Sequence, residues 1–120
     1  MNKKAIGSQG EKIAAQYLQK KGYKILEKNF KCKIGEIDLI ALYKGQIIFV
    51  EVKTRTSMNF GIPSEAVNFS KQQKILKIAQ VYMSISNYKH FQPRFDIIEI
   101  YLNHSTLTLE KLNHIPNAFF

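Results

Sequence analysis

Two short segments, residues 35–40 and 49–53, constrain the fold of this chain more than any other part of it. Both have the composition of β-strands, and Lys44-Gly45 is the only turn-like dipeptide between them. A two-residue loop at that point predicts a β-hairpin in which Asp38 lies directly opposite Glu51. Directly opposed residues have Cβ atoms about 5 Å apart, so two carboxylates repel and one pKa rises unless a cation lies between them. The hairpin therefore predicts a site that holds a metal or shares a proton.

The same register sorts the side chains of the hairpin onto two faces. One face is uniformly apolar and is expected to pack against a helix; it consists of Ile37, Leu39, Ala41, Ile48, Val50 and Val52. The other face is apolar near the turn, and its open end carries Glu36, Asp38, Glu51 and Lys53. The alternative is a solvated ladder of salt bridges on an exposed sheet face. Charges set among apolar neighbours usually have partners, which favours a functional site.

Asp38 and Glu51 have the chemistry of a magnesium or manganese site. Mg²⁺ typically takes one or two carboxylates in proteins and keeps several waters. A metal at this position polarises a phosphodiester and lowers the pKa of a bound water. Lys53, on the same face, is placed to orient the attacking water or to stabilise the charge of the transition state. The chemistry predicted is metal-dependent hydrolysis of a nucleic-acid backbone.

A third carboxylate, Glu11, is predicted to lie near this site from a separate helix. Its spacing continues the apolar stripe of Ala14, Ala15 and Leu18, so its side chain is expected to face the sheet. A carboxylate in that position is costly unless it meets a cation or a metal. The alternative is an acid placed at a helix N-terminus, where the helix dipole stabilises it.

Hydrophobic periodicity predicts two helices. The first covers residues 10–21, with Ser8 as a possible N-cap and Gly22 as the stop. The second opens at Ser70, in a sequence that resembles a capping box, and places Ile75, Ile78, Ala79 and Tyr82 on one face. Residues 64–67 are expected to form a short turn before it, after a polar loop over residues 54–63.

Three strands are predicted besides the hairpin, over residues 23–30, 94–102 and, more weakly, 106–112. The element order is then α-β-β-β-α-β-β, a mixed sheet flanked by helices in the α/β class. A chain of 120 residues fits one domain, covering residues 1–120. Arg94 and Asp96 alternate on their strand and are expected to form a structural ion pair; the alternative is that they belong to the site.

Charge points to a polyanionic partner. The chain has 18 Lys and Arg residues against 9 Asp and Glu residues, a formal charge of +9. Such an excess favours nucleic acid, because lysines near a phosphate backbone gain from counterion release. The residues chosen as phosphate contacts are Arg55, Lys71, Gln72 and Lys74, of which Lys71 and Gln72 open the second helix. The alternative for them is an ordinary solvated surface.

Several classes of protein are excluded or not favoured by the sequence. No segment approaches the roughly 20 apolar residues that cross a bilayer, and the N-terminus has no secretory pattern, so a cytoplasmic protein without a membrane partner is expected. Cys32 is the only cysteine, which excludes an internal disulfide and a multi-cysteine zinc site. His90, His104 and His114 share no metal-ligand spacing. The apolar end, residues 118–120, is expected either to dock on the core or to meet a partner.

Asp38 followed by Glu51-Val52-Lys53 resembles the PD-(D/E)xK motif of the restriction-endonuclease-like superfamily. With Glu11 added, the chain is similar to the Holliday-junction resolvases of archaea. More closely it resembles the bacterial YraN family of predicted endonucleases, through segments that span nearly the full length: residues 7–11, 35–40, 49–55, 60–63 and 94–98. Ile37 stands where the motif name has proline, and Ile suits a position within a strand.

The resemblance implies a restriction-endonuclease-like core in which Asp38 and Glu51 bind Mg²⁺ or Mn²⁺. It also implies that Lys53 is the catalytic lysine and that Glu11 is an accessory acid. The leading expectation is a metal-dependent endonuclease that acts on DNA more than on RNA, including branched DNA, and that works as a homodimer if it follows the resolvases. The alternatives are a non-catalytic nucleic-acid-binding module of the same fold and a protein-interaction adaptor.

Overall fold

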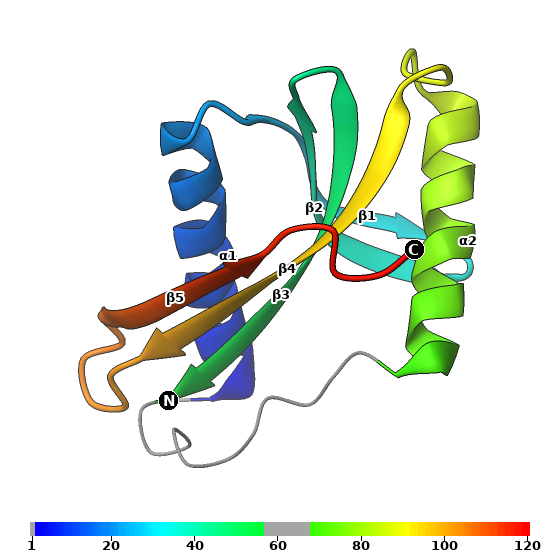
Figure 1. The fold of residues 1–120 in the computed structure, drawn as a ribbon. Helices are drawn as coiled ribbons and strands as arrows, with labels where there is room; N and C mark the ends of the chain where they lie inside the picture. The colour runs from blue at the N-terminus through cyan, green and yellow to red at the C-terminus, as the bar shows by residue number, and fades with distance from the viewer. Residues whose placement is uncertain (1, 57–67) are drawn as a thin grey trace.

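The structure, a computed structural model, describes residues 2–56 and 68–120 (Figure 1). The elements in chain order are α1 (Lys3–Lys20), β1 (Lys24–Cys32), β2 (Gly35–Tyr43), β3 (Gln46–Thr56), α2 (Phe69–Ile85), β4 (Gln92–Leu102) and β5 (Leu109–Ile115). The predicted element order and the mixed α/β class are confirmed. The turn predicted over residues 64–67 lies outside the described residues. The predicted loop over residues 54–63 was wrong at its start, because residues 54–56 continue β3.

The five strands form one sheet in the order β1-β2-β3-β4-β5. Neighbours are antiparallel except β3 and β4, which run parallel, so α2 connects them as a crossover. The predicted hairpin is confirmed at its turn: Tyr43 pairs with Gln46, and Lys44 and Gly45 have φ of 47° and 77°. Two positive φ values in a two-residue loop match the twist of the flanking strands. Regular pairing ends at Leu39 opposite Val50, one position before Asp38 and Glu51.

The two helices cover opposite faces of the sheet, as Figure 1 shows. The cluster under α1 contains Ala14, Ala15 and Leu18 together with most of the face predicted to be apolar, including Leu39, Ala41, Ile48 and Val50. The cluster under α2 contains all four residues predicted for the buried stripe of that helix: Ile75, Ile78, Ala79 and Tyr82. Two helices on one sheet thus give a three-layer molecule with a core on each side of the sheet.

Ile37 departs from the predicted face and packs in the cluster under α2. Its partner on β1 is Phe30, which belongs to the same cluster. Strand β1 has a register shift between Ile25 and Glu27 and a positive φ at Asn29, of 53°. Irregular pairing of this kind bends a strand pair and increases its twist. The side chains of β2 therefore do not alternate strictly between the two faces of the sheet near its start, where Ile37 lies.

Both helices begin earlier than predicted, and asparagine rather than serine caps each of them. Asn2 Oδ1 accepts a hydrogen bond from Ala5 N at 2.8 Å, and Asn68 Oδ1 accepts one from Lys71 N at 2.8 Å. Asparagine is among the best N-cap residues because its side-chain oxygen satisfies a free N–H of the first turn. Ser8 and Ser70 therefore lie inside helices. The predicted stop of α1 is confirmed at Gly22, whose φ is 95°.

The last strand also differs from its prediction, since β5 starts at Leu109 rather than at residue 106. The Asn103 side chain organises the preceding turn by accepting hydrogen bonds from Ser105 N at 2.8 Å and from Thr106 N at 3.1 Å. Such side-chain bonds compete with strand pairing and favour a turn. After β5 the chain docks on the core: Ala118 N donates to Phe95 O at 2.7 Å, and Phe119 is buried.

Neither α1 nor α2, the two helices of the described residues, is long and apolar enough to cross a membrane.

Candidate active site

A pocket of about 490 Å³ lies between the start of β2, the middle of β3 and the first turns of α2. It is lined by Gly35, Glu36, Asp38, Glu51, Asn68, Ser70, Lys71, Lys74, Ile75 and Ile78. The three acids predicted at the open end of the hairpin therefore line one pocket. Lysines from α2 lie across from them. The pocket thus brings the acids of one hairpin together with lysines of the crossover helix α2.

Asp38 is held in the wall of this pocket by the neighbouring strand. Its Oδ2 accepts a hydrogen bond from Val52 N at 2.8 Å, so the carboxylate takes over backbone pairing where the regular ladder has ended. Burial and the nearby charge of Glu51 raise the pKa of Asp38 to about 7, although the hydrogen bond from Val52 opposes that rise. A carboxyl with a pKa this high is protonated in about half of the molecules at neutral pH unless a cation replaces the proton.

Glu51 has a cationic partner that the sequence did not reveal. Lys71 Nζ lies 2.6 Å from Glu51 Oε1 and donates a hydrogen bond to it. The Glu51 side chain is 13% exposed, whereas the Lys71 side chain is 49% exposed. Lys71 was predicted to contact phosphate, and in the structure its side chain reaches β3 of the sheet. In this state its ammonium group compensates the charge of Glu51.

Lys53 follows Glu51 by two residues on β3 but does not line the pocket. It pairs in register with Glu99 of β4, and the charges of both Glu51 and Glu99 act on it. Burial lowers the pKa of Lys53, and the positive charges of Arg55 and Lys71 lower it further. Lys53 thus stands at the edge of the acidic group, within electrostatic reach of Glu51.

Glu11 lies in a neighbouring pocket rather than in the one that holds Asp38 and Glu51. That second pocket, of about 480 Å³, is lined by Lys3, Ile6, Gly7, Glu11, Val52, Thr54, Arg55 and Thr56. Burial raises the pKa of Glu11, a hydrogen bond with the Asn29 side chain lowers it, and the charges of Glu36 and Glu51 raise it. The Glu11 side chain therefore faces the sheet, as predicted. Its carboxylate is also close enough to Glu51 for the two negative charges to repel.

Helix α1 can bring Glu11 this close because Gly10 is buried against β3. A Cβ added at Gly10 would overlap the Thr54 side chain, so only glycine permits this approach of helix and strand. The sequence predicts a close approach of the backbone at the two glycines beside Glu11, and the structure confirms it at Gly10 but not at Gly7. A glycine on the side of a helix that faces the sheet lowers helix stability. Its presence there therefore indicates a close packing contact.

Three of the four predicted phosphate contacts line one of the two pockets. Lys71 and Lys74 line the pocket of Asp38 and Glu51, and Arg55 lines the pocket of Glu11. Gln72 belongs to the same helical turn but lines neither pocket. The basic side chains therefore border the acids from two directions.

The oxygen donors of the pocket suit a hard divalent cation that keeps part of its water shell. No three His, Cys, Asp or Glu side chains among the described residues are arranged as a complete metal cage. Two carboxylates in one open pocket are nevertheless the usual protein share of a Mg²⁺ site, in which waters and substrate oxygens complete the shell. Burial, and after it the charge of Glu51, raises the pKa of Asp38, and a bound cation would favour the charged carboxylate against both effects. The residues present fit Mg²⁺ or Mn²⁺.

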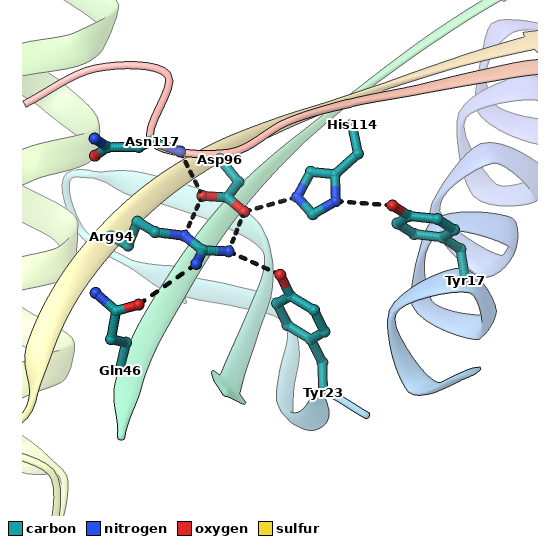
Figure 2. Close-up of polar contacts among 7 residues, drawn as sticks. All are labelled: Tyr17, Tyr23, Gln46, Arg94, Asp96, His114 and Asn117. Atoms are coloured by element: carbon teal, nitrogen blue, oxygen red, sulfur yellow. Dashed lines mark hydrogen bonds and ion pairs between the residues drawn. The ribbon is translucent and has the colours of Figure 1, made fainter. Parts of the chain in front are cut away.

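A second polar cluster lies away from the pocket, around the buried carboxylate of Asp96 (Figure 2). Asp96, which is 0% exposed, accepts hydrogen bonds from Arg94 Nη2 at 2.8 Å and from Asn117 N at 3.0 Å. His114 Nε2 lies 2.7 Å from Asp96 Oδ2, and its Nδ1 lies 3.0 Å from the Tyr17 hydroxyl. The structural ion pair predicted for Arg94 and Asp96 is confirmed. His114 is part of that network, which the spacing of the histidines did not reveal.

The comparisons with known proteins agree with the fold-wide resemblance. Residues 10–100 match the family described as "Uncharacterised protein family UPF0102", and the chain belongs to that family. A UPF0102 protein of Caldanaerobacter subterraneus subsp. tengcongensis is 80% identical, over 99% of this chain and 98% of that protein. A UPF0102 protein of Clostridioides difficile is 52% identical, over 99% of this chain and 100% of that protein. The resemblance to a YraN-like family is confirmed at the level of the family.

Proposed function

We propose that this protein is a metal-dependent endonuclease with a restriction-endonuclease-like core. Its substrate would be nucleic acid, DNA more than RNA and including branched DNA. The observation that carries the proposal is the pair of carboxylates, Asp38 and Glu51, in one pocket that lysines of α2 border. Acids that would hold a cation and lysines that would contact phosphate are the two parts that phosphodiester hydrolysis requires.

In this proposal Asp38 and Glu51 hold Mg²⁺ or Mn²⁺, with Glu11 as an accessory acid. The metal would neutralise charge on the phosphate and lower the pKa of the attacking water. Lys53 contributes a positive charge that stabilises the developing charge of the transition state. Its environment suits this role, because partial burial strengthens its interaction with a phosphate that enters the site.

Lys71 has two successive partners in the proposed cycle. Its ammonium group now lies on Glu51 Oε1, an oxygen that a cation would also use. A cation at this carboxylate would repel the Lys71 ammonium group, so Lys71 is expected to turn to a phosphate of the substrate. Its exposure permits this movement, since half of the side chain is already in solvent.

The same ion pair is the observation that favours the alternative function. Lys71 already compensates Glu51, so the acidic group needs less help from a metal than an isolated carboxylate pair. A non-catalytic nucleic-acid-binding module would keep this pair and use the remaining lysines for phosphate. Its binding would fall steeply with salt and would not respond to chelation of divalent cations.

Cleavage assays test the proposed function directly. Wild-type protein is incubated with duplex, single-stranded and branched DNA and with RNA, in Mg²⁺ or Mn²⁺. We expect cleavage of at least one substrate, and loss of it in Asp38→Ala and Lys53→Ala with folding and binding nearly intact. Lys89→Ala, which changes an exposed lysine away from both pockets, is the matched control and should remain active. A wild-type protein inert on every substrate with both metals would contradict the proposal.

Thermal melting separates the two candidate functions without an activity. A cation bound to the native state at 100 times its Kd stabilises it by about 2.7 kcal/mol. We expect Mg²⁺ or Mn²⁺ to raise the melting temperature of the wild type and not that of Asp38→Asn. Equal responses in the two proteins would favour the binding module.

A further inference from the structure

A groove adjoins the candidate active site on the outer side of the first turn of α2. It has a volume of about 470 Å³ and is lined by Ile34, Phe69, Ser70, Gln73, Lys74 and Lys77. Ser70 and Lys74 line both this groove and the pocket of Asp38. Ile34 precedes Gly35, which lines that pocket. The groove and the candidate site are therefore adjacent and share part of their lining.

The floor of this groove is apolar, and part of it faces solvent. Phe69 is 74% exposed and Ile34 is 39% exposed. A phenyl ring this exposed at the first position of a helix contributes little to the core, and exposed apolar surface with a polar rim is typical of a binding site. The ring leaves an aromatic face open to a flat, apolar ligand.

The rim of the groove is positively charged. Its two ionisable lining residues, among the described part of the chain, are Lys74 and Lys77. Lys74 crosses from the groove to the pocket: its Cε would lie 2.9 Å from a Cβ added at Gly35, so the lysine stem packs on the bare backbone of that glycine. An anion held by Lys74 would thus lie at the border of the groove and the candidate active site.

We propose that this groove binds an unpaired nucleotide, with its base stacked on Phe69 and its flanking phosphates on Lys74 and Lys77. An aromatic platform beside lysines is the chemistry of single-stranded nucleic-acid binding, because every base offers a flat apolar face and every nucleotide a phosphate. In a duplex those faces are covered by neighbouring bases. The proposal rests on the proposed function for the class of ligand and adds that the substrate is single-stranded on this side of the site.

A single tryptophan tests the stacking directly, because the chain contains none. Phe69→Trp places the indole in the groove, and stacking on a base quenches its fluorescence. The ligand is an unlabelled oligothymidylate of about 12 nucleotides. EDTA is present to chelate divalent cations, so that no cleavage occurs. We expect quenching that saturates with the oligonucleotide and is weaker with a blunt duplex. Ile85→Trp is the matched control, since Ile85 is 70% exposed at the other end of the same helix, and it should not be quenched.

Affinity supplies the second measurement. With a labelled strand of the same length, we expect Phe69→Leu to weaken binding about tenfold, because it keeps apolar bulk but loses the ring. Lys77→Ala should weaken binding and reduce its salt dependence by about one phosphate contact. A comparison of the affinities for DNA and RNA strands of the same length shows whether binding depends on the sugar. The proposal would be overturned if Phe69→Trp were not quenched at saturation, or if the wild type did not bind single strands. It would also be overturned if gel filtration showed a dimer of the wild type that Phe69→Leu dissociates, because a second copy would then occupy the groove.

The outcome is separable from that of the proposed function. A protein that cleaves duplex and single strands alike, with Phe69→Leu unchanged in both, would refute the groove and leave the nuclease. A protein that binds single strands through Phe69 but cleaves nothing would support the groove and refute the nuclease.

Discussion

Asp38 combines two opposing interactions at one carboxylate. Its hydrogen bond from Val52 N stabilises the charged form, whereas burial and the charge of Glu51 destabilise it more strongly. A group with a pKa of about 7 in the folded protein and an ordinary value of 3.8 otherwise binds a proton more tightly when folded. Protonation therefore stabilises the fold at this position, and a bound cation would do the same without the proton.

This linkage predicts a pH dependence of stability in the absence of divalent cations. The contribution of Asp38 is fully present below about pH 4 and is lost as the pH rises toward 7, because the carboxyl then ionises freely in the unfolded chain but keeps its proton in the folded protein. We expect Asp38→Asn to be more stable than the wild type at pH 8, on the order of 2 kcal/mol, and the difference to shrink toward pH 4. Urea unfolding at each pH measures it. Parallel stability curves for the two proteins would contradict the raised pKa.

At the scale of elements, the approach of α1 to β3 depends on the single residue Gly10. The two glycines of the helix are in opposite situations. A Cβ at Gly10 would overlap Thr54, whereas a Cβ at Gly7 would have no neighbour within 4 Å. The same chemical change is therefore a packing clash at one position and a simple gain of helix propensity at the other.

We expect Gly10→Ala to destabilise the protein by about 1–3 kcal/mol, because overpacking outweighs the better helix propensity of alanine. Gly7→Ala is the matched control and should stabilise it by up to about 1 kcal/mol. Chemical denaturation of both variants gives the two free energies. Equal effects of the two substitutions would mean that α1 does not rest on Thr54.

Element order was predictable from the sequence because it depends on local patterns. The stripe of α2 and the turn at Lys44-Gly45 each show in residues a few positions apart. The helix starts and the first residue of β5 were not predictable, since side chains of Asn2, Asn68 and Asn103 decide them and several polar residues nearby offered the same chemistry.

The site was predictable only in part, for a physical reason. Asp38 and Glu51 come from one hairpin, whose register a two-residue turn fixes. The Lys71–Glu51 pair joins α2 to β3, and no local pattern encodes how the crossover helix docks on the sheet. The separation of Glu11 into its own pocket has the same origin, because it depends on the approach of a helix to a strand.

At the scale of the whole molecule, the buried network in Figure 2 connects the beginning and the end of the chain. Tyr17 of α1 and Tyr23, just before β1, meet Arg94, Asp96 and His114 from β4 and β5. Burial acts to raise the pKa of Asp96, but hydrogen bonds from His114, Arg94 and Asn117 outweigh it, and the pKa lies below its ordinary value. The carboxylate is thus charged and fully satisfied, as a buried ion must be.

Removal of that charge should be costly. We expect Asp96→Ala to destabilise the protein by about 3–5 kcal/mol, because it leaves the Arg94 guanidinium partly buried without its partner. If that variant does not fold, Tyr17→Phe gives a milder test and should cost about 1 kcal/mol, through loss of one hydrogen bond to His114. Glu110→Ala, on an exposed contact with Asn103, is the control and should change stability by less than about 0.5 kcal/mol. Calorimetry of the four proteins measures the series.

The parallel pairing of β3 with β4 has a consequence for how the chain reaches this fold. Turns of two residues join β1 to β2 and β2 to β3, so these strands can associate early, whereas β4 arrives only after α2 has crossed the sheet. Until then β3 presents an unpaired edge that carries Ile47 and Phe49. The outer edge of β1 is interrupted by Lys24, Lys28 and Lys31, which discourage pairing with another chain. Aggregation should therefore be a hazard of the refolding intermediate, growing with protein concentration, rather than of the native state.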